Sequence, residues 1–469
     1  MTREHRLPIG GELVETGTWL DVRSPFSGEL VGRVAQAGAV ETRRAIDAAA
    51  AALTDPLPAH ERARILDRVA QLLRENRDEV AETISAEAGK PLRTARVEAE
   101  RAESTYTFAA VEARKLTGEM VAMDASPAGA GKLAFTLRLP IGIVGAISPF
   151  NFPLNLVAHK IAPALAAGCP VVLKPASATP LSALLLAHYE AQAGLPPGWL
   201  NVVVGPAAAI GDELVADERV KLITFTGSGG VGWSLAERAH TKRVKLELGN
   251  ATPAIVCDDA PADAAAKLAA NAFSFAGQSC ISVQRIYVLA GRWEAFLADF
   301  VPRVEALQVG DPADATVDVG PVISDRERDR ILAWIGESNG ELLTGGGTDE
   351  NGLILPTVIA NPDPLDKVSC EEIFGPVVSL YRVASLDEAL EQANATRYGL
   401  QAAIFTTDVT TALRAARELE FGGVTVNEAP TFRADQMPYG GVKASGNTKE
   451  GPAWTVREMT EERLVILQL

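Results

Sequence analysis

Cys280 ends a stretch of mostly small residues, 275–280 (Phe-Ala-Gly-Gln-Ser-Cys), that could admit a substrate to its side chain. A thiol ionises more readily than a serine hydroxyl and sulfur is intrinsically nucleophilic, so a thiolate here could attack a carbonyl carbon. Free cysteines are nevertheless among the most buried residues, and most of them only fill space in a core. Taken alone, the segment therefore favours a packing role for Cys280. A catalytic role needs support from residues elsewhere in the chain.

Four distant segments carry the other groups that oxidation of a thiohemiacetal would need. They are 149–153 (Pro-Phe-Asn-Phe-Pro), 225–228 (Phe-Thr-Gly-Ser), 246–249 (Leu-Glu-Leu-Gly) and 371–376 (Glu-Glu-Ile-Phe-Gly-Pro). With the cysteine segment, and in the same order along the chain, they resemble the motifs of the aldehyde dehydrogenase superfamily. The resemblance covers nearly the whole chain, from Gly10 past 437–443 (Met-Pro-Tyr-Gly-Gly-Val-Lys). It implies an NAD- or NADP-dependent enzyme that oxidises an aldehyde to its carboxylic acid.

Three residues receive catalytic roles that fit the chemistry of their side chains. Cys280 would add to the aldehyde carbon, and the Asn151 amide with the Cys280 backbone N–H would hold the oxygen that becomes negative. Hydride would pass to the nicotinamide and leave a thioester, which water hydrolyses once Glu247 removes its proton. The apolar neighbours Leu246 and Leu248 favour that role, because desolvation raises the pKa of a carboxyl group. Without its motif, Glu247 could instead cap or bridge a loop.

The coenzyme candidates follow expected strands. One buried strand ends at Lys174, at the edge where open α/β sheets place ligand groups, and this lysine would reach the adenosine ribose. A glycine-rich turn at 226–232 opens a helix whose N–H groups can approach a pyrophosphate, although it is not the GxGxxG fingerprint and could be a plain loop. The resemblance places two residues of 371–376 at the nicotinamide ribose, where the string could also be a structural turn. The expected coenzyme contacts are Pro149, Phe150, Lys174, Ser177, Gly227, Ser228, Gly232, Glu372 and Phe374.

Ser177 departs from a common family pattern. Family members committed to NAD often carry a glutamate three residues after the lysine, where it binds the ribose hydroxyls and repels a 2′-phosphate. In this chain a short, neutral hydroxyl stands at that distance from Lys174. Because the repulsive group is missing, we expect NADP to be tolerated or preferred over NAD.

The substrate pocket is harder to derive from the sequence. If a helix begins at Asn151, then Asn155 and His159 follow at four-residue steps and point toward the same cavity. Polar groups there would suit a small hydroxylated or charged aldehyde, but both side chains could equally serve helix packing and local hydrogen bonds. Arg101 could anchor an anion or form a salt bridge, and Arg433 could form part of the mouth of the pocket.

Two other functions stay open beside hydrolytic aldehyde oxidation. A dehydrogenase of the same fold could pass its thioester to coenzyme A, although Glu247 favours water as the acyl acceptor. A catalytically silent binding or structural protein could keep the fold, although Cys280, Glu247 and Asn151 are all present. Within the family, residues 159–163 and 280–285 look most like the branch of lactaldehyde, phosphonoacetaldehyde and non-phosphorylating glyceraldehyde-phosphate dehydrogenases.

The composition narrows the partners. With 44 basic and 60 acidic residues the net charge is −16, which argues against a nucleic-acid partner. Apolar runs are too short, or too interrupted by Gly and Pro, to cross a bilayer. The first residues lack the apolar core of a secretory signal, so we expect a cytoplasmic protein without a membrane partner. The four cysteines show no CxxC or Cys/His spacing, which predicts free thiols and no metal.

At 469 residues the chain exceeds what one hydrophobic core usually supports. Short β-branched runs alternate with alanine-rich helical stretches, which predicts an α/β fold with two Rossmann-like open-sheet domains. The expected strands are 141–147, 171–173, 202–204 and 222–225 in the first domain, and 254–257, 285–289, 377–381, 402–405 and 424–426 in the second. Apolar residues at helical spacing predict an amphipathic helix over 59–77.

A turn-rich hinge at 249–253 separates the two expected domains. We assign 1–116 with 140–248 to the coenzyme-binding domain, 249–438 to the catalytic domain, and 117–139 with 439–469 to a small β oligomerisation arm. An apolar terminal strand at 463–469 would invite aggregation if it were left bare. Cover by another subunit, which the resemblance also implies, predicts a homodimer or homotetramer, and the alternative is a tail that folds back on its own chain.

Overall fold

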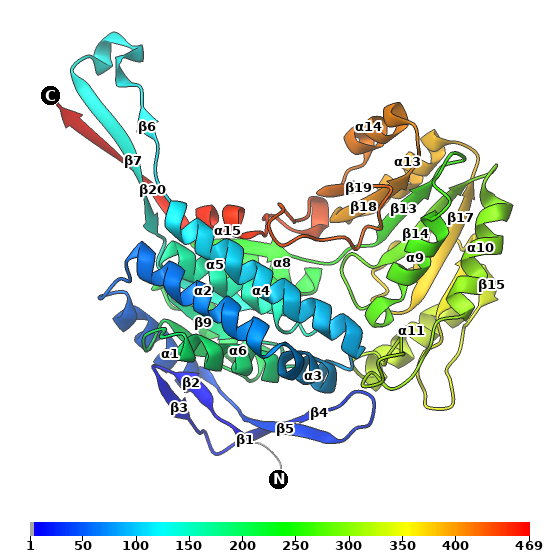
Figure 1. The fold of residues 1–469 in the computed structure, drawn as a ribbon, viewed down its shortest axis with the longest axis horizontal. Helices are drawn as coiled ribbons and strands as arrows, with labels where there is room; N and C mark the ends of the chain where they lie inside the picture. Colours follow the sequence, from blue (N-terminus) through cyan, green and yellow to red (C-terminus); the bar gives the residue numbers. More distant parts are fainter. Residues whose placement is uncertain (1–3) are drawn as a thin grey trace.

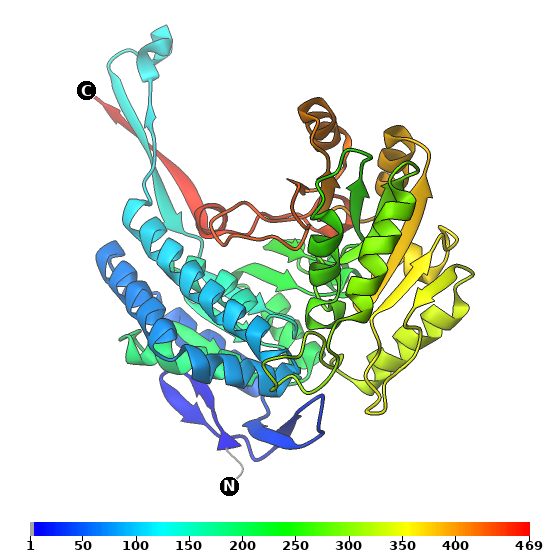
Figure 2. The ribbon, with the colours of Figure 1, turned by 45° about the vertical axis from the view of Figure 1, so that its right-hand side comes forward.

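Two open sheets, each packed against helices, form the body of the molecule, and a narrow β arm that ends in the C-terminus projects from the first of them (Figures 1 and 2). The computed structural model describes residues 4–469. The largest core lies around the first sheet, and separate clusters of buried apolar residues lie around the second. The prediction of an α/β fold with two Rossmann-like sheets and a small β arm is confirmed, whereas the residue boundaries of the domains stay a prediction.

The first sheet has five parallel strands in the order β10-β9-β8-β11-β12. They are β8 (Ile143–Ile147), β9 (Val171–Lys174), β10 (Leu200–Val202), β11 (Val220–Thr226) and β12 (Arg243–Glu247). The first four correspond to predicted strands, and their nearly continuous apolar runs are typical of parallel strands buried on both faces. The sequence analysis leaves out β12, an edge strand in which charged and apolar residues alternate.

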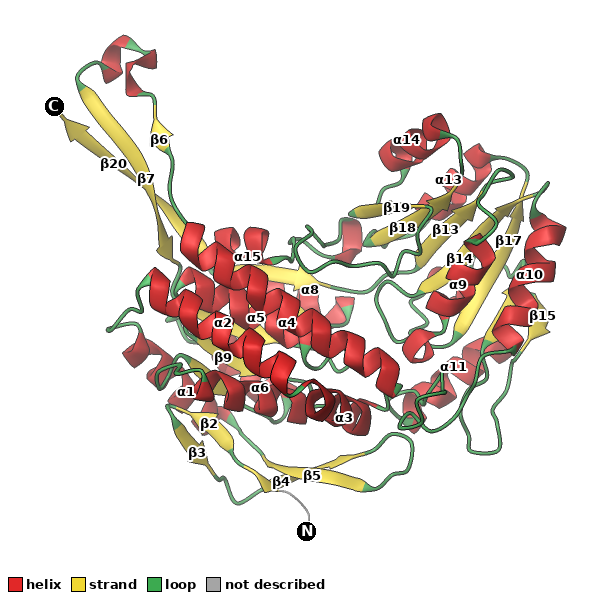
Figure 3. Ribbon diagram, in the orientation of Figure 1, coloured by secondary structure: helices red, strands yellow, loops and turns green. Residues whose placement is uncertain are grey.

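Two groups of helices pack against this sheet (Figure 3). They are α1 (Ala39–Ala52) with α7 (Ala207–Ala216), and a larger group of α2 (Ala59–Glu75), α3 (Arg77–Ala88), α4 (Leu92–Lys115), α5 (Asn155–Ala167) and α6 (Leu181–Gln192). Helix α8 (Gly229–Arg238) follows β11, and α15 (Pro452–Glu458) packs on α5. The predicted amphipathic helix is α2, whose apolar face, including Leu66 and Val69, is fully buried.

The second sheet has seven strands in the order β15-β16-β17-β14-β13-β18-β19, and all of its neighbouring pairs except β15–β16 are parallel. The strands are β13 (Thr252–Val256), β14 (Val283–Leu289), β15 (Glu341–Thr344), β16 (Thr357–Ala360), β17 (Val377–Val383), β18 (Gln401–Phe405) and β19 (Gly423–Val426). Its helices are α9 (Ala264–Ala272), α10 (Trp293–Glu305), α11 (Asp325–Glu337), α12 (Lys367–Cys370), α13 (Leu386–Asn394) and α14 (Val409–Glu418). All five predicted strands are present, while β15 and β16 are not predicted.

Five short strands near the N-terminus form two small sheets, which the sequence analysis does not predict because runs of two to six residues carry little periodic signal. They are β1 (Glu4–His5), β2 (Leu7–Ile9), β3 (Glu12–Val14), β4 (Trp19–Arg23) and β5 (Leu30–Ala35). The Gly10 backbone N–H donates to the Asn201 side chain at 2.9 Å, which ties this region to β10. The prediction about a secretory signal falls partly on residues 1–3, outside the described residues.

The projecting arm is a three-stranded antiparallel sheet in the order β20-β7-β6 (Figure 1). Its strands are β6 (Met120–Val121), β7 (Lys132–Pro140) and β20 (Thr460–Gln468). The pairing of β20 with β7 runs from Thr460 opposite Pro140 to Gln468 opposite Lys132. One edge of the terminal strand is therefore covered by its own chain, as in the fold-back alternative, and not by another subunit. The other edge of β20 has no strand partner within residues 4–469.

The described residues also bear on the predictions about membranes, cysteines and metals. No helix of residues 4–469 combines the length and the apolar character needed to cross a membrane. The four cysteines are free. In the described part of the chain, no three His, Cys, Asp or Glu side chains gather in a way that could hold a metal ion. The absence of a metal from the protein stays a prediction.

Strand ends of the two sheets face each other, and the expected site residues lie at those ends. In the first sheet, Lys174 and Glu247 are the last residues of β9 and β12, and Asn151 follows the end of β8. In the second sheet, Cys280 and Phe374 precede the starts of β14 and β17. The site therefore lies between the carboxyl ends of one set of strands, where open sheets bind ligands, and the amino ends of the other.

Candidate active site

The loop before Cys280 has an unusual backbone. Phe275 and Ala276 adopt φ of 49° and 51°, and Gly277 continues with φ of 68°, so three successive residues lie in the left-handed region. This conformation costs a residue with a Cβ about 1–2 kcal/mol. The turn packs tightly, since a Cβ on Gly277 would lie 2.1 Å from the Gly375 carbonyl oxygen. Tertiary packing therefore holds the cysteine loop against the loop that precedes β17.

Cys280 is half-buried, and its Sγ lies 3.0 Å from the phenol oxygen of Tyr439. Burial raises the pKa of the Cys280 thiol to about 12, and the hydrogen bond with Tyr439 opposes that change. The carboxyl groups of Glu372 and Glu247 raise this pKa further, while the Arg433 guanidinium lowers it. The sulfur is therefore protonated at neutral pH in this state, and attack on a carbonyl needs groups that favour the thiolate.

Asn151 lies in the turn between β8 and α5. Helix α5 begins at Asn155, so a helix start at Asn151, the condition of the pocket prediction, is wrong. The Asn151 side-chain amide Nδ2 donates to the Gln278 carbonyl oxygen at 3.0 Å. Because Gln278 is two residues before Cys280, this bond places an amide donor of the first sheet beside the cysteine loop of the second. The arrangement fits a donor for an oxyanion.

The fully buried Lys90 stabilises the position of Asn151 beside the cysteine loop. The Lys90 ammonium pairs with Glu98 and donates to the Asn151 carbonyl oxygen at 2.6 Å. It also lies 3.8 Å from the centre of the Phe152 ring and 4.5 Å from that of Phe275, which are cation–π distances. One charge thus contacts both the Asn151 turn and the turn that leads to Cys280.

Glu98 completes this support at the start of α5. Its Oε1 accepts hydrogen bonds from the Leu154 and Asn155 N–H groups at 2.9 and 3.1 Å. A carboxylate at a helix N-terminus satisfies otherwise unpaired donors and interacts favourably with the helix dipole. Neither Lys90 nor Glu98 is among the residues predicted from the sequence, because only the tertiary structure brings the α3–α4 connection and the start of α4 beside Asn151.

Glu247 ends β12 and is buried without a partner. Neither carboxylate oxygen has a hydrogen-bond partner among the described residues. Desolvation, followed by the nearby negative charge of Glu450, raises the pKa of Glu247 well above its ordinary value. Arg433 and Lys160 act in the opposite direction. A carboxyl group whose pKa is raised toward neutrality is suited to accept a proton from water.

Glu450 is a second buried carboxylate in the same neighbourhood, but it is fully paired. It forms ion pairs with Lys160 at 3.2 Å and with Arg433 at 2.9 Å. Burial would raise the pKa of Glu450, but Lys160 and Arg433 outweigh it and hold the pKa at about 2. Two neighbouring carboxyl groups with opposite pKa shifts are a feature of sites that perform acid–base chemistry.

The expected adenosine side of the coenzyme site lies along the carboxyl ends of β9 and β11. Lys174 is buried, which lowers the pKa of its ammonium, and donates to the Pro175 carbonyl oxygen at 3.2 Å. The Ser177 hydroxyl donates to the Gly205 carbonyl oxygen at 3.2 Å. Ser228 is the residue directly before α8, whose first N–H groups are available to an anion.

Glycines keep the turn before α8 narrow. A Cβ on Gly227 would lie 2.7 Å from the Phe225 ring, and one on Gly232 would lie 2.5 Å from Leu248. Both glycines therefore allow close packing of the turn and of α8 against the sheet. These residues fit a dinucleotide bound across the edge of the sheet, and their contacts with the coenzyme stay a prediction.

The expected nicotinamide side lies between the two sheets. Phe374, at φ of 51°, packs edge-on against Phe150 with ring centres 5.7 Å apart, and Pro149 directly precedes Phe150. Glu372 accepts a hydrogen bond from the Asn250 N–H at 3.0 Å, and burial raises its pKa to about 7. Glu372 and Phe374 line one small cavity together with the start of the cysteine loop. The structure thus brings Phe150, from the first sheet, to residues that precede β17.

Three of the four substrate-pocket candidates converge on one carboxylate oxygen. Oδ1 of Asp435 lies 3.0 Å from an Arg101 nitrogen, 3.1 Å from Asn155 Nδ2 and 2.9 Å from His159 Nε2. Arg101 therefore forms the salt bridge that the sequence analysis names as its alternative role. Asn155 and His159 share a helix face as predicted, and both contact Asp435.

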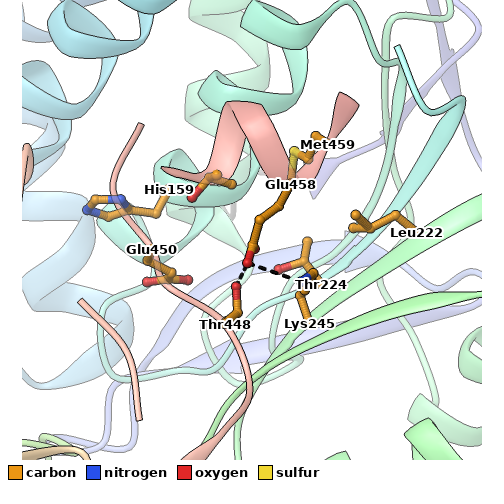
Figure 4. A pocket seen from close by; sticks show the side chains of 9 residues that line it. His159, Leu222, Thr224, Lys245, Thr448, Glu450, Glu458 and Met459 are labelled. Carbon is orange, nitrogen blue, oxygen red and sulfur yellow. Dashed lines mark hydrogen bonds and ion pairs between the residues drawn. The ribbon is translucent and has the colours of Figure 1, made fainter. Parts of the chain in front are cut away.

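His159 also borders a small cavity whose wall includes both polar and apolar side chains (Figure 4). The cavity wall includes Glu450 and a group in which Glu458 pairs with Lys245 at 3.0 Å and accepts a hydrogen bond from Thr448. Of the two predicted cavity residues, His159 lines it and Asn155 does not, in the described part of the chain. Burial, followed by the charge of Arg433, lowers the pKa of His159 and favours the neutral ring.

Arg433 lies beside the nucleophile instead of at an outer rim. Its guanidinium carbon is 3.8 Å from the centre of the Tyr439 ring, and it pairs with Glu450. The Nε–H groups of Arg433 and Arg101 are both buried and have no acceptor within residues 4–469. An unsatisfied buried donor costs about 1–3 kcal/mol, so both positions would gain from an anionic ligand.

The chain is similar to known proteins over nearly its whole length. The model of the aldehyde dehydrogenase family matches residues 14–465. The chain is 41% identical over 470 residues to 3-sulfolactaldehyde dehydrogenase of Priestia aryabhattai, covering 100% of this chain and 98% of that protein. The fold is similar to aldehyde dehydrogenase 21 from Physcomitrella patens in complex with the reaction product succinate, with a TM-score of 0.96, 38% identity and coverage of 100% and 99%. It is also similar to glyceraldehyde-3-phosphate dehydrogenase GapN from Methanocaldococcus jannaschii complexed with NADP, with a TM-score of 0.93, 38% identity and coverage of 97% and 100%.

The half-buried Cys280 lies between two open α/β sheets, as expected for the nucleophile of a dehydrogenase. The chain belongs to the aldehyde dehydrogenase family. It is an NAD(P)-dependent aldehyde dehydrogenase, and the resemblance to the branch named from the sequence is confirmed by its relatives. The roles of the individual residues stay predictions.

Tyr439, Lys160 and Glu450 are site residues to which the sequence analysis gives no role. Tyr439 lies within the motif 437–443, and Lys160 lies within 159–163, so both segments are noticed for their resemblance. Glu450 follows the last of these motifs by only a few residues, but nothing local marks it as buried. A signal for Lys160 was present, since a lysine within an otherwise apolar helix needs a buried partner.

The backbone of the cysteine loop gives a direct test. Gly277→Ala would put a Cβ 2.1 Å from the Gly375 oxygen at a φ of 68°, so the loop has to move. We expect a free energy of unfolding lower by about 1–3 kcal/mol and a kcat at least about tenfold lower. Urea unfolding and steady-state kinetics measure both. The matched control is Gly336→Ala in α11, where a Cβ meets nothing within 4 Å, and equal behaviour of the two variants would contradict the tight packing.

Proposed function

We propose that the protein oxidises a small anionic aldehyde with Cys280, Asn151 and Glu247 as its catalytic residues, NADP as the favoured oxidising coenzyme and water as the final acyl acceptor. The observation that carries this proposal is the meeting of the two sheets at the nucleophile. The Asn151 amide contacts the carbonyl of Gln278 on the cysteine loop at 3.0 Å. The Glu247 carboxyl, at the end of the edge strand, is buried with both oxygens free to accept a proton.

The first half of the reaction forms the carbon–sulfur bond. The Cys280 thiolate donates an electron pair to the aldehyde carbon, and the carbonyl π electrons move to the oxygen, which the Asn151 amide and the Cys280 N–H stabilise. A bound nicotinamide coenzyme would supply the acceptor for the hydride of the former aldehyde carbon. The oxygen then re-forms its double bond to carbon, and Cys280 carries a thioester.

The second half releases the acid. Glu247 removes a proton from water as the water oxygen bonds to the thioester carbon. The carbon–sulfur bond breaks, and the sulfur leaves with the electron pair as a thiolate. The proton held by Glu247 is then lost to solvent. A dedicated buried base favours water over coenzyme A as the acceptor, because a thiol acceptor would not need a base whose pKa is raised so strongly.

Ser177 supports NADP as the favoured coenzyme. Among the described residues its hydroxyl bonds to the Gly205 carbonyl oxygen alone, and the position carries no negative charge that would repel a 2′-phosphate. Lys174, three residues earlier, supplies a nearby ammonium. Among the similar structures, that of the Methanocaldococcus jannaschii protein contains NADP.

Arg101 and Arg433 support an anionic substrate. Each has a buried Nε–H that finds no acceptor in the described part of the chain, and Arg433 also stacks on the ring whose hydroxyl contacts Cys280. An aldehyde that carries a carboxylate, phosphate or sulfonate a few bonds from its carbonyl could satisfy these donors while its carbonyl reaches Cys280. The relatives include a 3-sulfolactaldehyde dehydrogenase and a structure with bound succinate, whose names imply anionic compounds of this size.

The arm supports a homo-oligomer. Its terminal strand β20 exposes Leu464 and Ile466, which are 53% and 50% accessible in the isolated chain. Met120 of β6 is 69% accessible on the other edge of the same sheet. A projecting sheet with a free edge and exposed apolar residues is a hazard unless it is covered. We assign that cover to a second copy of the chain, in a dimer or a tetramer.

The hydrolytic base is tested with Glu247→Gln. We expect a burst of about one reduced coenzyme per subunit followed by turnover about 10²–10⁴ times slower, because acylation persists and deacylation loses its base. The wild-type rate should rise with pH as Glu247 ionises, and the variant should lose that rise. Stopped-flow absorbance of the reduced coenzyme measures both. Cys280→Ser is the control, with coenzyme binding but no burst, and an unchanged steady state in Glu247→Gln would remove this residue from the mechanism.

Coenzyme preference is tested with Ser177→Glu. A carboxylate at this position should lower kcat/KM for NADP at least about tenfold relative to NAD, because it repels the 2′-phosphate. The isosteric but neutral Ser177→Gln separates charge from size and should retain most of the NADP activity. A wild-type preference for NAD above about a hundredfold would overturn the assignment. The protein would then reject NADP without a carboxylate at position 177, so another group would set the preference.

The anion site is tested with Arg101→Gln. Loss of a charged donor should raise KM for succinic semialdehyde about 10–100-fold, and KM for the neutral aldehyde propanal should change little. Arg114→Gln, on the same helix but paired with Asp67 at the surface, is the matched control and should leave both unchanged. Equal losses for the charged and the neutral aldehyde would show that Arg101 only stabilises the fold.

A further inference from the structure

Tyr439 presents its hydroxyl to the nucleophile in a fixed geometry. Its phenol oxygen lies 3.0 Å from Cys280 Sγ, and its side chain is 3% accessible. The backbone is held on both sides by Glu450, since the Tyr439 N–H donates to the Glu450 carbonyl oxygen at 3.0 Å and the Tyr439 carbonyl oxygen accepts from the Glu450 N–H at 2.5 Å. The ring packs against Ile281 and Leu400. The hydroxyl therefore has little freedom to turn away from the sulfur.

The direction of this hydrogen bond depends on the charge of the sulfur. A neutral thiol can donate weakly to the phenol oxygen, or accept from the phenol O–H. A thiolate has no hydrogen, so Tyr439 has to be the donor when Cys280 is ionised. Hydrogen bonds to a charged acceptor are about twice as strong as neutral ones. The contact between Tyr439 and Cys280 thus stabilises the reactive form of the sulfur more than the resting form.

The other groups around the sulfur make that donor necessary. Burial and the carboxyl groups of Glu372 and Glu247 all disfavour a negative charge on Cys280. Only Arg433 supplies an opposing charge among the groups that act on Cys280, and its guanidinium lies over the Tyr439 ring and pairs with Glu450. Burial raises the pKa of the Tyr439 phenol well above its ordinary value, which keeps the phenol proton in place. The charge of Arg433 acts in the opposite direction on this pKa.

We propose that Tyr439 is a further catalytic residue, whose phenol O–H donates a hydrogen bond to the Cys280 thiolate. This bond raises the fraction of Cys280 that is ionised and able to attack an aldehyde. The thiol proton is lost to water, and the phenol keeps its own proton throughout. The inference rests on the proposed function only in taking Cys280 as the nucleophile. It assigns a chemical role to a hydroxyl that ring packing alone does not require.

Alkylation of Cys280 by iodoacetamide tests the role without an aldehyde or a coenzyme. In this reaction the thiolate forms a carbon–sulfur bond and iodide leaves, so the rate below the pKa of the thiol reports the thiolate fraction. Tyr439→Phe keeps the ring, its packing and the contact with Arg433, and removes only the hydroxyl. We expect alkylation about tenfold slower than wild type at each pH from 7 to 9, with the same slope against pH. Peptide mass spectrometry identifies the labelled residue, and Cys280→Ser gives the background.

Tyr189→Phe is the matched control, because it removes a phenol whose hydroxyl donates to Glu79 on α3. It should alkylate at the wild-type rate. If Tyr439→Phe also alkylates at the wild-type rate, or faster, while coenzyme binding and the melting temperature show a folded protein, the proposal is overturned. Active Cys280→Ser would instead overturn the proposed function and leave the result on thiol acidity intact.

A second measurement covers the case in which Tyr439→Phe does not fold. Replacing all 6 tyrosines with 3-fluorotyrosine makes each phenol a stronger donor while preserving its size. The change should act in the opposite direction and make alkylation of Cys280 faster at a given pH. The alkylation rate of the fluorinated protein is compared with that of unfluorinated wild type, and also with that of Tyr439→Phe if this variant folds. Slower or unchanged alkylation in the fluorinated protein would contradict donation from Tyr439 to the sulfur.

Discussion

The bond from the Asn151 amide to the Gln278 carbonyl is the interaction on which the site depends. It joins the carboxyl edge of the first sheet to the loop that leads into the second, at 3.0 Å. Lys90 strengthens the same junction, because one buried ammonium contacts the Asn151 carbonyl and the Phe275 ring. Without this junction, the nucleophile and its oxyanion donor would belong to two separately packed bodies, and their distance would vary with every motion between the sheets.

Several charged groups are buried near this junction, which is costly. Whether each carboxyl group has a partner determines whether it is ionised. Glu450 has two cationic partners and stays ionised, whereas Glu247 has no hydrogen-bond partner among the described residues and favours its neutral form. The two carboxyl groups feel similar surroundings, yet their pKa values move in opposite directions because only one accepts directly from Lys160 and Arg433. Catalytic carboxyl groups are commonly separated in this way.

The same principle extends to the sulfur and to the substrate side. Burial that would suppress the Cys280 thiolate is offset by one hydroxyl and one guanidinium, those of Tyr439 and Arg433. Arg433 thus contacts the ring of the proposed thiolate donor and keeps one N–H free for a ligand. Recognition of an anionic substrate and activation of the nucleophile are therefore adjacent in space, although nothing in the local sequence of 433–439 indicates it.

Patterns along the chain predict the fold class, nine strands of the two sheets, the amphipathic helix and the candidate catalytic residues Cys280, Glu247 and Asn151. These follow from periodicity and from ordered motifs, which are local properties of the chain. The sequence alone could not place β12, whose strand character depends on its neighbour at the sheet edge, or show that α5 begins at Asn155. The meeting of Arg101, Asn155 and His159 at Asp435 is visible only in the folded chain, and so are the pairing of the terminal strand with β7 and the contact of Tyr439 with the sulfur. The physical reason is that burial and partner choice arise between residues far apart in sequence, and these two quantities set the charge and the reactivity of every group in the site.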